Sequence, residues 1–127
     1  MTHNDSYIKA TTYIKATKIS SDKQGKSFFS QIQIKLNDKG EIGFLSNPQN
    51  AKSIIFRITG NDYDYDWHNA PQKQYIVILE GEVEIEVSTG EKKIFGGGDV
   101  LLVEDVEGQG HRSRAVSGTR KSIFVTL

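Results

Sequence analysis

The feature that most constrains the fold is a series of short segments in which apolar and polar residues alternate and which end at glycine-containing turns. In one segment Val83, Ile85 and Val87 alternate with three glutamates, which is the two-residue period of a strand buried on one face. No segment keeps the 3.6-residue period of a helix for more than a turn or two. Many short strands separated by such turns predict an all-β, antiparallel sandwich or barrel with these three residues, Leu101 and Val103 in its core.

Length and composition indicate one globular domain. A chain of 127 residues can bury one core but not two. The 16 basic and 16 acidic residues cancel, and no apolar run is long enough to span a bilayer, so we expect no nucleic-acid or membrane partner. The absence of cysteine excludes disulfides and thiolate chemistry. The first residues lack the pattern of a signal peptide, and we therefore expect a cytoplasmic protein.

The segment from residue 60 to residue 111 contains the residues that point to a site. A polar corner with His68 leads into the apolar strand 75–79, and a later Gly-x-x-His sequence ends in His111. Each histidine lies at the edge of a predicted strand. The two histidines can therefore meet in the mouth of a small barrel.

These segments resemble the two motifs of the cupin superfamily. The first motif is a glycine, a His-x-His pair, a glutamate and a second glycine, and its positions are held here by Gly60, Asp66, His68, Gln74 and Gly81. The second motif runs from Gly-Asp to Gly-x-x-His, and its positions are held here by Gly98, Asp99, Gly108 and His111. The resemblance covers residues 50–127 well. Residues 1–20, which match only by general pattern, are expected to form an N-terminal arm or edge strands.

The resemblance implies a single domain over residues 1–127, folded as a jelly-roll or double-stranded β-helix barrel. The family's metal site uses three histidines and one glutamate, and here Asp66 and Gln74 occupy two of those four positions. One carboxylate remains, so the set His68, Gln74, His111 and Asp66 either binds divalent iron, manganese, nickel or zinc, or forms a polar pocket without metal. The alternative for His68 is a structural histidine hydrogen-bonded to the turn at Pro71.

Other residues near the motifs complete the predicted pocket. Tyr63, Tyr65 and Trp67 alternate with aspartates, so an extended strand here has one aromatic and one acidic face. We expect Tyr65 and Trp67 to bind a ligand together with Gln74; the alternative is an edge strand with a solvated acidic face.

Charged residues near His111 are expected to lie outside the pocket. Arg112 and Arg114 lie close to His111 in the sequence, and in a strand both point to the face opposite His111, which indicates surface or interface charges. Glu104, Asp105 and Glu107 are expected to form a solvated loop at the rim of the barrel.

Two classes of function remain open. One is an enzyme acting on a small molecule, a metal-dependent dioxygenase or an isomerase or epimerase, with His68, His111 and Asp66 as catalytic residues. The other is a cupin that binds or senses a small ligand without metal and without turnover, because one fold serves both.

The chain is also expected to be a homodimer. The strand 75–79 is apolar on both faces, and the outer face needs a cover. A repeated block, Tyr-Ile-Lys-Ala-Thr at residues 7–11 and 13–17, keeps the same faces in both copies. The cover is expected to be either the second subunit or this arm, which is predicted to pair across the dimer.

Overall fold

The computed structural model describes residues 12–127, which form twelve strands and one short 3-10 helix, η1 (Gly40–Ile42). The strands are β1 (Tyr13–Ser21), β2 (Ser27–Lys35), β3 (Asn37–Asp38), β4 (Phe44–Leu45), β5 (Ser53–Thr59), β6 (Asp64–His68), β7 (Gln74–Glu80), β8 (Val83–Val87), β9 (Lys92–Phe95), β10 (Val100–Val103), β11 (His111–Ala115) and β12 (Arg120–Thr126). Over this part of the chain, no helix is long and apolar enough to cross a membrane.

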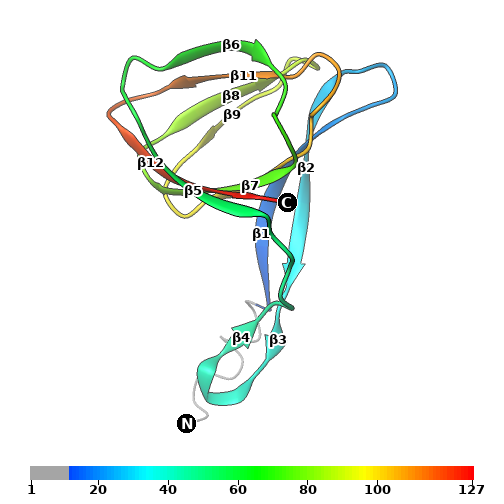
Figure 1. Cartoon of the computed structure of the whole chain (residues 1–127), viewed down its shortest axis with the longest axis vertical. Helices are drawn as coiled ribbons and strands as arrows, with labels where there is room; N and C mark the ends of the chain where they lie inside the picture. The colour runs from blue at the N-terminus through cyan, green and yellow to red at the C-terminus, as the bar shows by residue number, and fades with distance from the viewer. Residues whose placement is uncertain (1–11) are drawn as a thin grey trace.

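Two sheets face each other and enclose the core (Figure 1). The larger sheet has six strands in the order β2-β1-β10-β7-β12-β5, and the smaller has four in the order β6-β11-β8-β9. This arrangement confirms the predicted all-β jelly-roll barrel. The expectation of purely antiparallel pairing was wrong at one place, because β1 runs parallel to β10 with Thr17 opposite Leu101.

The core forms where the two-residue alternation predicted it. Val83, Ile85 and Val87 of β8 are at most 4% exposed, as are Leu101 and Val103 of β10. The glutamates of β8 point outward and pair with arginines of the neighbouring β11 at 2.8 Å. Arg112 and Arg114 therefore lie on the outer surface, as their position in the strand predicted.

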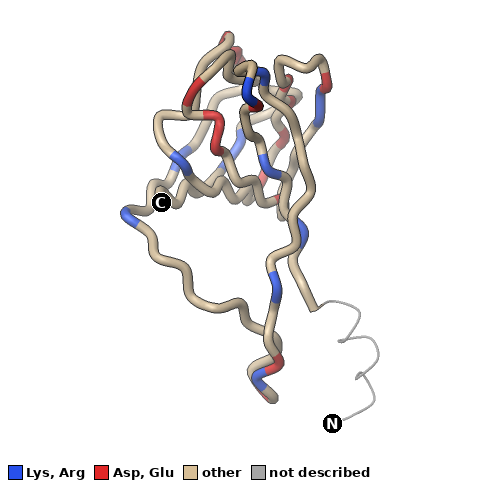
Figure 2. The backbone as a smooth tube through the Cα atoms, turned by 90° about the vertical axis from the view of Figure 1, so that its right-hand side faces the viewer, with Lys and Arg blue, Asp and Glu red and all other residues tan. Residues whose placement is uncertain are grey.

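The two N-terminal strands extend beyond the barrel, and the β3–β4 hairpin lies away from it (Figure 1). Strand β1 lies between β2 and β10 and is not an edge strand, because β2 covers its other side. The second copy of the repeated block lies in β1, whereas the first copy falls outside the described residues. Acidic and basic residues are interspersed along the backbone (Figure 2).

The outer face of β5 is apolar and exposed. Ile54, Phe56 and Ile58 are 58%, 72% and 71% exposed, and they alternate with Ile55 and Arg57, which line the interior. Leu79 of β7, in the same sheet, is also exposed. An apolar surface of this kind is typical of a protein–protein contact.

Candidate functional site

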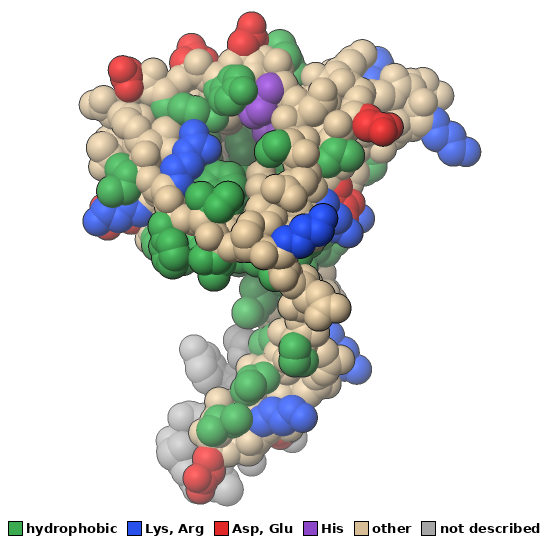
Figure 3. Space-filling model, in the orientation of Figure 1, with side chains coloured by type: hydrophobic (Ala, Val, Ile, Leu, Met, Phe, Trp, Pro, Cys, Tyr) green, Lys and Arg blue, Asp and Glu red, His purple; other side chains and the backbone are tan. Residues whose placement is uncertain are grey.

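A cavity of about 380 Å³ opens between the two sheets, at the small end of the range of about 300–1,000 Å³ for small-molecule pockets. Its walls are largely aliphatic, from Ile76, Ile78, Ile85 and Leu101. Figure 3 shows the opening as a hollow with histidine on one side and a basic side chain on the other. The cavity is therefore apolar in its body and polar at its two ends.

Two histidines form one end of the cavity. His68 of β6 lies opposite His111 of β11 in the sheet, and their ring centroids are 4.5 Å apart. Gly110, with φ of 74°, allows this close approach, because a Cβ atom there would overlap the carbonyl group of His68. Gln74 and Tyr65 also line the cavity, so four of the predicted site residues come together.

A β-bulge in β6 decides which of its side chains face the cavity. Between the pairs His111–His68 and Ser113–Tyr65, β6 advances three residues while β11 advances two. Tyr65 and His68 consequently point the same way, with stacked rings 3.8 Å apart.

The same bulge turns two predicted site residues away from the cavity. Asp66 and Trp67 are not among the residues that line it, and Trp67 instead lies under the guanidinium of Arg112, 5.6 Å from its ring centroid. A regular strand would have placed Trp67 beside Tyr65. The predicted catalytic and metal-binding role of Asp66 and the predicted ligand contact of Trp67 therefore lack the required placement.

His68 is held in one tautomer by the backbone. Its Nδ1 lies 2.7 Å from the carbonyl oxygen of Asp66, and since a carbonyl only accepts, Nδ1 carries the proton. Burial lowers the pKa of His68 from its ordinary value, partly opposed by this hydrogen bond, while the neighbouring His111 lowers it further. The neutral ring therefore has Nε2 as its free, proton-accepting nitrogen.

His111 is held by a buried carboxylate. Asp105 is 0% exposed, and its Oδ2 lies 2.5 Å from Nδ1 of His111. The other oxygen, Oδ1, has no hydrogen-bond partner among the described residues. This pairing orients the imidazole and leaves Nε2 of His111 available to a ligand.

The expectation of a solvated acidic loop was wrong for Asp105. The backbone carbonyl of Asp105 accepts hydrogen bonds from the side chain of Asn69 and from the backbone N–H of Ala70, both at 3.2 Å. These bonds turn the carboxylate inward. Glu104 pairs with Lys73 at 2.9 Å, and only Glu107 is exposed as expected. The sequence feature that could have indicated this burial is the position of Asp105 between two apolar residues, Val103 and Val106.

The residues present do not fit the predicted metal set. In the described part of the chain no three His, Cys, Asp or Glu side chains are grouped so that they could hold a metal ion. Asp105 engages Nδ1 of His111 and so cannot share an ion bound at Nε2. The remaining candidate, Gln74, supplies only a neutral amide. Catalytic metal sites in proteins usually have three protein ligands, and two imidazoles without a carboxylate fall short of this.

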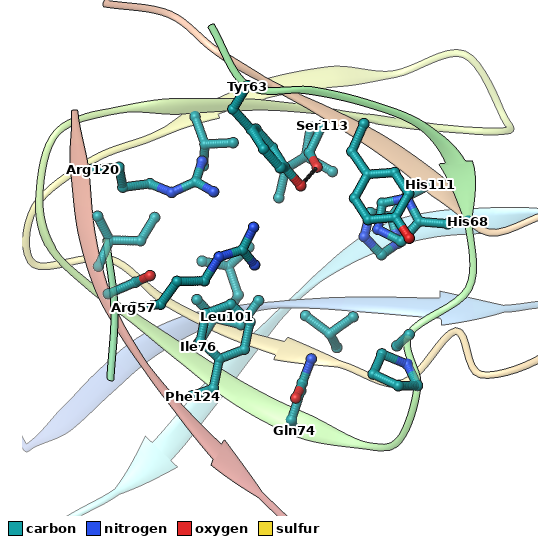
Figure 4. Close-up of a pocket in the computed structure, with 18 of the residues that line it drawn as sticks. Arg57, Tyr63, His68, Gln74, Ile76, Leu101, His111, Ser113, Arg120 and Phe124 are labelled. Atoms are coloured by element: carbon teal, nitrogen blue, oxygen red, sulfur yellow. Dashed lines mark hydrogen bonds between the residues drawn. The ribbon is translucent and has the colours of Figure 1, made fainter. Parts of the chain in front are cut away.

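The end of the cavity opposite the histidines has two arginines that the sequence analysis did not identify (Figure 4). The guanidinium carbons of Arg57 and Arg120 lie 5.3 and 5.1 Å from the ring centroid of Tyr63. Arg120 is only 8% exposed, and burial lowers its pKa from the ordinary value. The sequence feature that could have indicated this site is Arg57, the single charged residue in the apolar run Ile-Ile-Phe-Arg-Ile.

Comparisons with known proteins concern the fold alone. No protein-family model and no curated protein matches this sequence. Among solved structures, protein NMB1881 from Neisseria meningitidis is 19% identical, with a TM-score of 0.46 over 62% of this chain and 78% of that one. The Schizosaccharomyces pombe Cnp3 cupin domain is 10% identical, with a TM-score of 0.47 over 92% and 86%. A structure of Fe(II) HppE in complex with substrate is 22% identical, with a TM-score of 0.40 over 58% and 43%.

The class of protein follows from the barrel and its mouth. Two facing sheets enclose the core, and the histidines of both motifs meet at one end of the cavity. Together they form the jelly-roll barrel that the resemblance to the two cupin motifs implied.

Proposed function

We propose that this cupin binds a small molecule in the barrel mouth and catalyses a metal-independent proton transfer on it, of the isomerase or epimerase type. The observation that carries the proposal is the buried Asp105–His111 pair, at 2.5 Å, with the second imidazole of His68 beside it. In this assignment His111 is the general base, Asp105 positions it, and His68 is the second proton-transfer group.

The hydrogen bonds support this assignment. Nδ1 of each histidine is occupied by an oxygen atom, so Nε2 is the nitrogen that each ring offers to a substrate. When Nε2 of His111 accepts a proton, the carboxylate of Asp105 stabilises the imidazolium that forms. A neutral imidazole beside it, whose pKa is lowered by burial, remains able to accept or relay a proton.

The reaction needs no further reagent. The bond that breaks is a C–H bond next to a carbonyl group, the proton goes to Nε2 of His111, and the electron pair moves to the carbonyl oxygen as an enolate. Return of the proton to another carbon, or to the other face of the same carbon, completes the isomerisation or epimerisation. No oxidant or reductant is consumed.

Two other functions give distinguishable results. A metal-dependent oxygenase of the predicted type is disfavoured by the donor set, which lacks a carboxylate for the ion. A module that binds its ligand without turnover uses the same cavity. In an enzyme Asp105 and His111 are needed for the proton transfer, whereas in a binding module they only shape the cavity.

Hydrogen–deuterium exchange tests the proposal. We would incubate the protein, dialysed against EDTA, in D₂O with a panel of small carbonyl compounds, neutral and anionic, and follow their C–H signals by NMR. Exchange should fall by about 10²-fold or more in Asp105→Asn and His111→Gln. Glu107→Gln, an exposed carboxylate in the same loop, is the matched control. Binding without exchange would favour the binding module, and exchange restored only by added metal would favour the metalloenzyme.

A further inference from the structure

Two arginines inside the barrel differ from two on its outer surface. Outside, Arg112 pairs with Glu86 and Arg114 with Glu84, each at 2.8 Å. Inside, no carboxylate of residues 12–127 lies within ion-pair distance of Arg120, which is buried, or of Arg57, which is half-buried. A guanidinium that is buried without a counter-ion is costly for the fold. Such a group is retained most readily where its counter-ion is a ligand.

The surroundings of the two arginines offset that cost only in part. Both guanidiniums lie over the ring of Tyr63, and Arg57 also lies 5.5 Å from the ring centroid of Phe124. Aromatic faces attract cations weakly compared with a carboxylate. The hydroxyl of Tyr63 is engaged with Ser113 at 2.7 Å.

An unused hydroxyl lies beside the same pair. Ser122 is opposite Arg57 in the β5–β12 register and two residues from Arg120 on the same face of β12. Ser122 is one of the residues that line the cavity, and its buried Oγ has no hydrogen-bond partner among the described residues. Buried hydroxyls are nearly always hydrogen-bonded. Two unpaired cations and one unsatisfied hydroxyl therefore converge on one end of the cavity.

We propose that Arg57, Arg120 and Ser122 form an oxyanion site, and that the ligand of this protein is a small organic anion with an apolar body. The site deepens the proposed function and rests on the ligand occupying that same cavity. A planar guanidinium binds the two oxygens of a carboxylate, or those of a phosphate monoester, with two parallel hydrogen bonds.

The geometry of the cavity also orients this ligand. In Figure 4 the arginines and the histidines lie at opposite ends, with Tyr63 and Ser113 between them and with Ile76 and Leu101 on the wall below Arg57. An anionic group bound at Arg57 and Arg120 directs the body of the ligand along the aliphatic wall toward Nε2 of His68 and His111. The substrate class is thus a small acid whose reactive C–H lies a few bonds from its anionic group.

Calorimetric and NMR titrations test the site with defined probes. Benzoate and hexanoate represent carboxylates, phenyl phosphate and inorganic phosphate represent phosphates, and benzyl alcohol is the neutral control. We expect at least one organic anion to bind about tenfold or more tightly than benzyl alcohol, with lower affinity at high salt. Comparing benzoate with phenyl phosphate decides which head group is preferred. Inorganic phosphate should bind more weakly than phenyl phosphate, because it lacks the apolar body.

Arginine variants then locate the binding. Arg57→Met and Arg120→Met should each lower the affinity for the anion by about 10- to 100-fold, with no change for benzyl alcohol. Arg114→Met, on the outer face, is the matched control and should bind as the wild type does. Thermal unfolding of each variant shows that it is folded, and Arg57→Lys, which keeps the charge, should recover part of the affinity.

The outcomes separate this inference from the proposed function. Equal affinity for anions and benzyl alcohol, or anion binding that is unchanged in both methionine variants, would overturn the oxyanion site. Arginine-dependent binding of an anion without any hydrogen–deuterium exchange would leave the site standing and remove the acid–base chemistry. Hydrogen–deuterium exchange on neutral compounds alone would support the acid–base chemistry and remove the oxyanion site.

Discussion

Replacing Arg120 by methionine should make the unliganded protein more stable. Arg120 is 8% exposed and has no carboxylate partner among the described residues. Its main compensation is the ring of Tyr63 at 5.1 Å, and such cation–π contacts contribute about 0.5–2 kcal/mol. The desolvation penalty of a buried ion is several kcal/mol after relaxation. Methionine retains a sulfur–aromatic contact that contributes about 0.3–1.5 kcal/mol.

The balance of these effects favours the variant. We expect Arg120→Met to raise the free energy of unfolding by about 1–2 kcal/mol, which for a domain of this size raises Tm by roughly 4–8 °C. The measurement is urea and thermal unfolding followed by circular dichroism, on protein refolded from urea to remove any bound anion. Saturating benzoate should stabilise the wild type and not the variant, because ligand binding adds stability to the folded state only.

The control is Arg114→Met, where the arginine is exposed and paired with Glu84. Its free energy of unfolding should change by about 0.5 kcal/mol or less. If Arg120→Met instead lowers Tm by several degrees in ligand-free protein, Arg120 is a structural residue whose charge the fold itself compensates. Its unpaired guanidinium would then not indicate an anionic ligand.

Three further predictions follow from the site and the surface. Gly110→Ala, at φ 74° and against the His68 carbonyl, should destabilise the protein by at least about 1 kcal/mol more than Gly98→Ala, at φ 92° in open space; equal losses in urea unfolding would show that β6 does not approach β11 this closely. Because burial lowers the pKa of His68, the unfolded chain binds more protons than the folded protein just below pH 6.5, and the free energy of unfolding should decrease as pH falls from 6.5 toward that lowered pKa. His68→Gln should abolish this part of the decrease. An unchanged pH profile in the variant would contradict a lowered pKa of His68. A homodimer formed through the exposed β5 face should sediment as a dimer at micromolar concentration, and Phe56→Glu should give a folded monomer; a monomeric wild type would refute the dimer.

Local patterns in the sequence were enough for the fold and for half of the site. The alternation of Val83, Ile85 and Val87 with glutamates predicted a strand with one buried face, and all three are in the core. The spacing of the two motifs predicted that His68 and His111 would meet in the barrel mouth, and their rings are 4.5 Å apart. Side-chain period and turn residues are properties of neighbouring residues, so they can be recognised without knowing what a strand packs against.

Other features of the site depend on contacts between segments distant in the sequence. The bulge that turns His68 inward and Asp66 outward exists only in the pairing of β6 with β11. The burial of Asp105 depends on a hydrogen bond from Asn69, 36 residues earlier. No local pattern reports either contact.

The sequence by itself therefore determined the all-β barrel, its core and the histidine pair, because strand period and motif spacing encode them. Only the tertiary structure decided the charges of the site. It buried Asp105 against His111, brought Arg57 of β5 and Arg120 of β12 to the same ring of Tyr63, and moved Asp66 out of the cavity. The physical reason is that the energy of a charge depends on whether water or another charge surrounds it, and those surroundings come from strands that meet only in the folded barrel.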